Sequence, residues 1–262
     1  MHDSNHCAEC GRAIDVPQQH FCPACGQPTP VHRVDWHFLG HELEHSLLHM
    51  DRGLLFTLKS LVLRPGVFIR AYLAGRRAGH VRPVMLISLM AAILTVASTY
   101  LAHADIVDAG HSMDLPSNSR AAADGLARHF TVALEWINHH YAWAALLLLP
   151  IEASAFQLAF RRFRHLNYPE WLVITAYLTG LSFLIQTVLV LFDHWLPDRM
   201  LWAGIFSLGY MVFALAQFFE GYPKWKSVLR ALWGMTLYQI TMMLVGAAYA
   251  AAMLAAHVLR AG

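Results

Sequence analysis

Long apolar segments separated by short polar ones make up the C-terminal two thirds of the chain. Five of these segments come close to the ~20 mostly apolar residues that an α-helix needs to cross a ~30 Å hydrocarbon layer. They cover residues 83–103, 141–160, 170–195, 199–219 and 228–259. The pattern therefore predicts an all-α integral membrane protein with a five-helix transmembrane bundle over residues 83–262.

The segment before the bundle, residues 31–82, has a different pattern. Apolar residues recur three or four positions apart between Trp36 and Leu54, which places them along one narrow stripe of a helix. Asp35 is a suitable N-cap for this helix, and Pro65 ends one helix and can open the next. We therefore expect interfacial amphipathic helices in this segment, lying on the membrane surface or packed on the bundle.

Composition agrees with a membrane protein. Hydrophobic residues make up 57% of the 262 residues and charged residues only 14%, and the mean hydropathy is +0.41. A soluble protein of this length does not string together so many uncharged runs. Composition therefore excludes an ordinary soluble enzyme or binding domain.

The positive charges indicate how the chain is oriented. Of the 19 Lys and Arg residues, all but Arg120, Arg128, Arg199 and Arg260 lie before the first span or in and beside the loops after the second and fourth spans. Because cytoplasmic loops are enriched in Lys and Arg, we expect a cytoplasmic N-terminus and a C-terminus outside. The opening residues contain no apolar stretch typical of a signal peptide, so we expect the first span to direct its own insertion.

Four cysteines near the N-terminus form two Cys-x-x-Cys-Gly motifs. Cys7 and Cys10 belong to the first motif, and Cys22 and Cys25 belong to the second. Two such motifs at this distance are typical of a tetrahedral four-thiolate zinc site, in which the glycine lets the backbone turn beneath the sulfurs. We therefore predict a structural Zn²⁺ in a cytoplasmic zinc ribbon, residues 1–30. A thioredoxin-like redox pair is the alternative, but no βαβ pattern surrounds the two pairs.

The charge of the predicted ribbon argues against nucleic-acid binding. A closed four-thiolate site leaves no open coordination position, so we assign it no catalysis. Residues 1–35 carry few basic groups, and these are outnumbered by acidic ones. The basic residues are Arg12 and Arg33, and the acidic ones are Asp3, Glu9, Asp15 and Asp35. This is no phosphate-binding footprint, so we expect no nucleic acid and favour contact with a protein or with the membrane domain of the chain itself.

The helix that follows Asp35 contains the pattern His41-Glu-Leu-Glu-His45. In such a pattern the imidazoles of His41 and His45 converge on one Zn²⁺, and Glu42 acts as the general base on the bound water. The pattern is short, and a chain with 17 histidines meets it easily by chance. Two interpretations are therefore open. The histidines form a second metal site, or they form a solvated face of the helix that responds to pH.

Basic residues gather immediately before the first span. They are Lys59, Arg64, Arg70, Arg76, Arg77 and Arg82. Contact with anionic lipid headgroups is the simplest explanation, because each basic side chain near such a surface contributes roughly 1 kcal/mol. A site for a phosphorylated or acidic partner is the alternative.

Few polar side chains lie inside the predicted spans. Glu152 follows Pro150 near the middle of the second span, and Gln239 lies at a similar depth in the fifth, so the two side chains can meet. An ionisable residue at this depth indicates a proton or ligand site, as in a small transporter. The alternative is a neutral carboxyl group that is hydrogen-bonded to an amide and joins two helices.

Several motifs together resemble a known family. They are the two cysteine motifs, the His-Glu-x-x-His pattern, Arg64-Pro-Gly66, Ile69-Arg-x-Tyr-x-x-Gly75-x-Arg77 and Pro83. The chain resembles bacterial zinc-ribbon membrane proteins of the domain of unknown function family 3667, over essentially its whole length. The resemblance implies a zinc-ribbon head on a small membrane bundle and brings no activity and no catalytic residues with it.

These observations lead to one main hypothesis and two alternatives. The main hypothesis is a non-catalytic, multi-pass protein of the bacterial cytoplasmic membrane, with an assembly or regulatory role carried by the ribbon and the membrane-surface helices. The first alternative is a membrane metalloenzyme, a hydrolase that uses His41, Glu42 and His45. The second is a small transporter that uses Glu152.

Overall fold

The computed structural model of the chain describes residues 6–14, 20–40, 53–102, 136–137, 140–163, 165–192, 195–196 and 198–261. Within these ranges the regular secondary structure is helical, with no strand. The helices are α2 (Leu54–Leu63), α3 (Pro65–Leu73), α4 (Pro83–Ala97), the π-helix η1 (Ser98–Ala102), α6 (Tyr141–Ala159), α7 (Tyr168–Val190), α8 (Arg199–Phe218) and α9 (Lys224–Ala261). Residues 36–40 begin one more helix, and Asp35 accepts a hydrogen bond from the Phe38 amide at 2.8 Å, as its predicted N-cap role requires.

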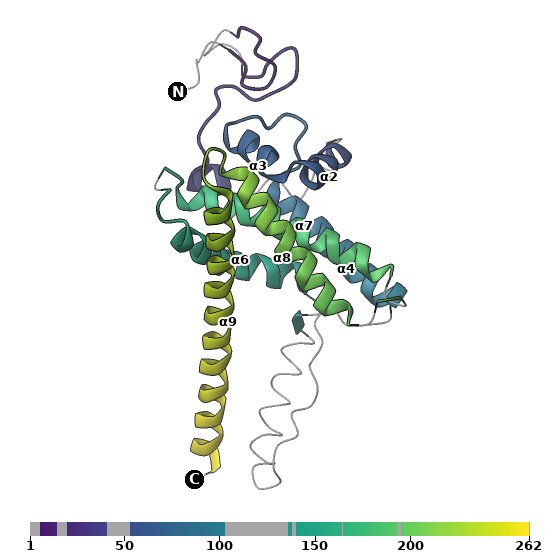
Figure 1. Cartoon of the computed structure of the whole chain (residues 1–262), viewed down its shortest axis with the longest axis vertical. Helices are drawn as coiled ribbons and strands as arrows, with labels where there is room; N and C mark the ends of the chain where they lie inside the picture. The colour runs from purple at the N-terminus through teal and green to yellow at the C-terminus, as the bar shows by residue number, and fades with distance from the viewer. Residues whose placement is uncertain are drawn as a thin grey trace.

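Five helices in the described part of the chain are long and apolar enough to cross a membrane. They are α4 continued by η1, then α6, α7, α8 and α9 (Figure 1). The five expected spans are thus confirmed, and the chain is a multi-pass membrane protein by the length and composition of its helices. Two of the expected boundaries shift: the third span is α7, and the fifth is the longer α9.

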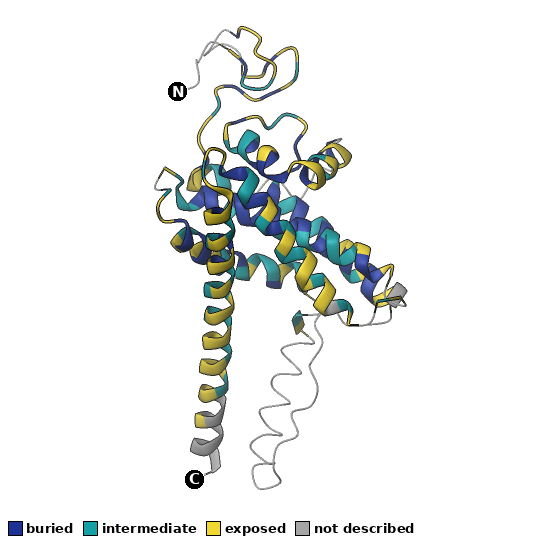
Figure 2. Cartoon of the chain, in the orientation of Figure 1, coloured by how far each residue is buried: buried dark blue, intermediate teal, exposed yellow. Residues whose placement is uncertain are grey.

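The helix α7 lies at the centre of the bundle. It packs against α4, α6 and α8. Of its apolar stretch, 61% is buried inside the protein, compared with 11% of the apolar stretch of α9. Trp171, Ile174 and Tyr177 are fully buried along it. Figure 2 shows buried residues concentrated where the helices pack together and exposed ones along most of α9. Because lipid covers the outside of such a bundle, the apolar surface of the peripheral helices needs no protein partner.

The start of α7 is set by a capping box. The Asn167 side chain accepts a hydrogen bond from the Glu170 amide at 2.8 Å, and the Glu170 carboxylate accepts one from the Asn167 amide at 2.8 Å. These two bonds satisfy amides that a helix start leaves without partners. The helix therefore begins at Tyr168, two residues before the expected position, and ends at Val190 rather than near residue 195.

The helices α2 and α3 pack on the bundle, and each contributes buried residues to its core. Pro65 separates them, as the sequence indicated, and opens α3. The buried residues Leu61, Phe68 and Tyr72 join the same apolar core as the spans, and α3 packs against α8. Gly66 makes this close approach, because a Cβ added there would lie 2.3 Å from the backbone nitrogen of Phe218.

The last helix, α9, extends beyond the others. Its 38 residues give a length of roughly 57 Å at ~1.5 Å per residue, more than the ~30 Å hydrocarbon layer needs. Its first part packs against α6 and α8, and its C-terminal part continues past the ends of the other labelled helices (Figure 1). The cysteine motifs and the last turns of α9 consequently lie at opposite ends of the molecule (Figure 1).

Candidate functional site

Each cysteine motif folds into a small hairpin, and the two hairpins share the same hydrogen bonds. The Cys7 amide donates to the Arg12 carbonyl at 2.8 Å, and the Cys22 amide donates to the Gln27 carbonyl at 2.8 Å. Each hairpin is closed by an isolated antiparallel β-bridge, the first between residues 6 and 13 and the second between residues 21 and 28. The repeated motif in the sequence therefore corresponds to a repeated backbone structure.

The glycine after each second cysteine allows the tight turn. Gly11 and Gly26 have φ angles of 72° and 74°, in the left-handed region that residues with a Cβ rarely adopt. Their amides donate to the carbonyls of Cys7 and Cys22, both at 2.9 Å. The role predicted for these glycines, turning the backbone beneath the sulfurs, is confirmed.

The four sulfur atoms gather at one point. The Sγ atoms of Cys7, Cys10, Cys22 and Cys25 all lie within 4.8 Å of one another, with 3.5 Å between Cys7 and Cys25 and 3.6 Å between Cys10 and Cys22. Four thiolates at ~2.3 Å from a tetrahedral Zn²⁺ would lie roughly 3.8 Å apart. The residues present therefore fit a four-thiolate metal ion.

The electrostatics of the sulfurs favour a cation among them. The backbone hydrogen bond from Ala24 lowers the pKa of Cys22. Burial raises the pKa of Cys25 to about 12. Because crowded thiolates cannot all ionise without a compensating charge, a bound cation is what allows the whole set to act as ligands.

The second hairpin is fixed to the bundle by the Gln27 side chain. We call residues 6–14 and 20–35 the head. Gln27 is buried, its Nε2 donates to the Gly75 carbonyl at 2.9 Å, and its Oε1 accepts from the amides of Arg77 and Ala78 at 3.0 and 2.8 Å. One amide side chain two residues after Cys25 thus satisfies three backbone groups of the loop between α3 and α4.

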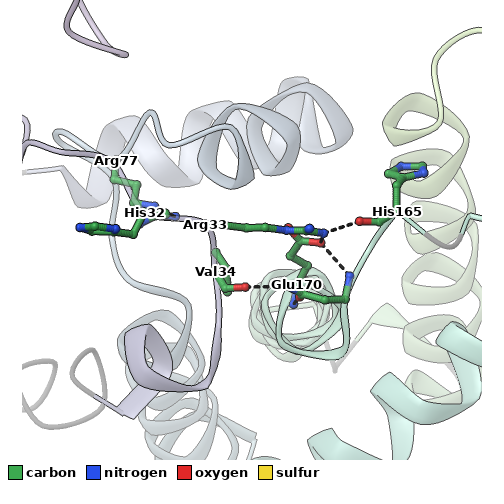
Figure 3. A network of polar contacts seen from close by, with 7 residues as sticks. His32, Arg33, Val34, Arg77, His165 and Glu170 are labelled. Atoms are coloured by element: carbon green, nitrogen blue, oxygen red, sulfur yellow. Dashed lines mark hydrogen bonds and ion pairs between the residues drawn. The ribbon is translucent and has the colours of Figure 1, made fainter. Parts of the chain in front are cut away.

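A second connection joins the head to the start of α7. Arg33 extends to Glu170 and donates two hydrogen bonds to its carboxylate, from Nε at 2.7 Å and from Nη2 at 2.8 Å (Figure 3). The same guanidinium donates to the His165 carbonyl, and Asn167 Nδ2 donates to the Val34 carbonyl at 2.8 Å. The Glu170 that caps α7 is therefore also the anchor of the head.

The chain between these two connections is packed on the bundle. Val34 is fully buried in the common core. Arg77 donates to the His32 carbonyl at 3.1 Å, and its guanidinium lies 4.0 Å from the centre of the Phe38 ring. We refer to the contacts of Gln27 and Arg33 as the head–bundle clamp, because together they join the thiol cluster to the loop between α3 and α4 and to α7.

We expect the Arg33–Glu170 pair to contribute measurably to stability. The Glu170 side chain is 7% exposed and that of Arg33 58% exposed, so solvent screens the pair in part. Replacing Arg33 by Met should lower the free energy of unfolding in detergent micelles by about 1–2 kcal/mol. A double-mutant cycle with Glu170→Gln should give a coupling of about 1 kcal/mol.

The control for this cycle is Arg12→Met, because Arg12 is exposed and lies in the same head. Its effect should stay within about 0.5 kcal/mol. Strictly additive effects of Arg33→Met and Glu170→Gln would show that the two charges contribute independently to stability. The Arg33–Glu170 pair would then not count as a stabilising part of the clamp.

The histidine motif lies outside the described residues. His41, Glu42 and His45, the candidates for a second metal site, fall in the range 41–52, so the structure does not test them. The described helical residues before them, 36–40, include His37, which is exposed. The second metal site and the solvated histidine face both stay predictions.

Inside the bundle, Glu152 has a partner on the neighbouring helix. Thr179 of α7 donates to Glu152 Oε2 at 2.9 Å. Gln239, the partner considered from the sequence, is exposed on α9. A hydroxyl bond between α6 and α7 agrees with the structural interpretation of Glu152, in which the carboxyl group joins two helices.

The clamp is the part of the site that sequence reasoning missed. The signature Asn167-x-x-Glu170 is visible before an apolar run and is a recognisable helix start. Nothing along the chain links it to Arg33, which lies more than 130 positions earlier. The role of Gln27 could not be predicted either, because nothing in the sequence around a glutamine shows which distant backbone groups it will bind.

Comparison with known proteins adds one family match. Residues 51–95 match the model of a family described as "Protein of unknown function (DUF3667)". The matched stretch includes α2, α3 and most of α4, and it supports the family resemblance for this part of the chain. No curated protein and no solved structure matches the chain.

Proposed function

We propose that this chain is a non-catalytic protein of the bacterial cytoplasmic membrane whose zinc-bound head regulates the bundle by docking on it. The observation that carries the proposal is the bonding of Gln27. Its amide belongs to the hairpin that supplies Cys22 and Cys25, and it holds the loop between α3 and α4 by three hydrogen bonds.

The fold of the head depends on its metal in this proposal. Within the head, Cys7, Ile14 and Cys22 form the buried apolar cluster, and Cys25 packs against it. Such a small core is insufficient to hold a domain together, so metal binding would supply the folding free energy. Losing the metal would consequently remove Gln27 from its position on the loop.

The proposed topology places the head in the cytoplasm. The excess of Lys and Arg before the first span and around Arg161 and Lys226 supports this orientation. A reducing cytoplasm keeps the four thiols available for metal. The exposed Lys59 and Arg64 would then lie on the cytoplasmic side, where anionic lipid headgroups are available to them.

Backbone amide exchange in the full-length protein tests the docking. On removal of zinc by a chelator, the Arg77 and Ala78 amides should exchange faster, because both donate to Gln27. The Val81 amide is the internal control, since it donates to Thr57 Oγ1 within the bundle at 3.0 Å and should stay protected. Unchanged exchange at Arg77 and Ala78 in metal-free protein would refute metal-dependent docking.

Metal content separates this proposal from a metalloenzyme. One zinc per chain, retained in His41→Ala, supports the non-catalytic head. Two metal ions per chain, one of them lost in His41→Ala, would instead favour the hydrolase that uses His41, Glu42 and His45.

A further inference from the structure

A cavity of about 840 Å³ lies between the head and the bundle. The head lines it with residues of the segment 26–32, and the loop before α4 lines it from the other side with Arg77, His80 and Arg82. The first turn of the helix after Asp35 closes a third side. Its volume falls in the range of small-molecule sites, which run from about 300 to 1,000 Å³.

Basic side chains outnumber acidic ones in the lining of the cavity. The basic side chains are Arg77, Arg82, His32, His37 and His80, and the single carboxylate is Asp35. The Asp35 carboxylate is engaged, because it accepts the Phe38 amide at the helix start. An anion entering the cavity would therefore meet cations without a free competing carboxylate in the described lining.

The two arginines of the cavity differ in what they contact. Arg77 donates to the His32 carbonyl and stacks on Phe38, so its guanidinium is already used in holding the head on the bundle. Arg82 has a buried Nη1 with no hydrogen-bond partner among the described residues. The Arg82 guanidinium is therefore only partly engaged within the protein, and the same residue lines the cavity.

The position of Arg82 is fixed by the backbone around it. The Val81 amide donates to Thr57, and the Val81 carbonyl accepts from the Tyr177 hydroxyl at 2.8 Å. Arg82 is also the N-cap of α4, whose partial positive charge at the N-terminus adds to that of the guanidinium. The cationic wall of the cavity is thus preorganised by the bundle.

We infer that this cavity binds a small anionic ligand through a phosphate group, with Arg82 as its main donor. A guanidinium matches the oxygens of a phosphate in geometry and charge. Arg82 directly precedes the first span, so the cavity lies at the depth of lipid headgroups in the proposed topology. The phosphate can belong to a lipid headgroup or to a soluble compound. The inference rests on the proposed function in one respect, because the docked head forms one wall of the cavity.

The test uses full-length, zinc-loaded protein in phosphatidylcholine nanodiscs and two probes. Inorganic phosphate represents a soluble ligand, and phosphatidic acid added to the nanodisc represents a lipid. At least one probe should raise the unfolding temperature saturably. Arg82→Gln should weaken that probe about tenfold or more, which corresponds to one lost charge-assisted hydrogen bond. An effect of phosphatidic acid alone identifies the lipid source, and an effect of inorganic phosphate identifies the soluble one.

Two further variants keep the result interpretable. His32→Glu places a negative charge at an exposed cavity residue whose docking contact uses only its backbone carbonyl. It should also weaken the probe, and it decides the matter if Arg82→Gln fails to fold. Lys59→Gln removes an exposed charge from α2, outside the cavity lining, and should bind like the wild type.

Two results would overturn the inference: neither probe binds the wild-type protein, or both cavity variants bind like Lys59→Gln. Failure of the proposed function looks different. If metal removal leaves the Arg77 and Ala78 amides protected while phosphate still binds through Arg82, the cavity stands and metal-dependent docking does not. If docking depends on metal but no probe binds, the docking stands and the cavity inference fails.

Discussion

Cys22→Ser should abolish stoichiometric zinc binding and release the head from the bundle. The Cys22 thiol is buried within the four-sulfur cluster, and its Sγ lies 3.6 Å from that of Cys10. Structural zinc in comparable four-ligand sites contributes apparent binding free energies of about 10–16 kcal/mol, and the loss of one thiolate removes much of this. Elemental analysis of the purified full-length protein measures the metal directly.

The matched control is His20→Ala, two residues from Cys22. His20 is exposed and is not one of the four clustered ligands. Its backbone carbonyl, which accepts the Thr29 amide at 2.9 Å, is unaffected by the substitution. This variant should keep one zinc per chain. Full zinc content in Cys22→Ser, with unchanged exchange of the Arg77 amide, would contradict the assignment of the four thiols as the metal site.

Gly66→Ala should destabilise the bundle by about 3 kcal/mol. The added Cβ would lie 2.3 Å from the Phe218 nitrogen and 2.5 Å from the Ala214 carbonyl oxygen, both in the backbone of α8. Backbone atoms in a packed helix cannot move aside as a flexible side chain can, so α3 must shift away from α8. The shift would also break the bond from the Gly66 amide to Gln217 Oε1, now 2.9 Å. Unfolding in mixed detergent micelles measures the loss.

Two other glycines serve as controls for this substitution. At Gly180, an added Cβ meets the Leu86 side chain at 3.2 Å, which can yield by a few tenths of an ångström. At Gly204 it meets nothing within 4 Å. Gly180→Ala should therefore cost about 1 kcal/mol or less, and Gly204→Ala should be neutral or slightly stabilising through helix propensity. Equal effects at all three positions would show that propensity, and not the contact with α8, decides the outcome.

The spans could be predicted from the sequence because lipid imposes a local rule. Every backbone polar group in the hydrocarbon layer must be satisfied within its own segment, which leaves a helix as the local solution for an apolar run. The shift at the start of α7 has an equally local cause, the capping box of Asn167 and Glu170. The direct approach of α3 to α8 at Gly66 has no local cause, since Phe218 and Ala214 lie far along the chain.

The thiol cluster was also predictable, whereas its attachment was not. The spacing of Cys7, Cys10, Cys22 and Cys25, with a glycine after each pair, predicts two hairpins whose sulfurs can hold one metal ion. The partner of Arg33 depends on how the chain returns to the head after two spans and their loops. A charged side chain in a sequence carries no information on which distant carboxylate it will reach.

By itself, the sequence determined five apolar helices, a basic segment before them and four thiols spaced for one metal ion. These features follow from local rules, namely the thickness of a membrane, the period of a helix and the reach of a Cys-x-x-Cys hairpin. The tertiary structure decided that Gln27 and Arg33 join the head to the bundle. It also decided that Arg82 lines a cavity between the head and the bundle. Those contacts join residues far apart along the chain, and such pairs are set by the packing of the whole molecule.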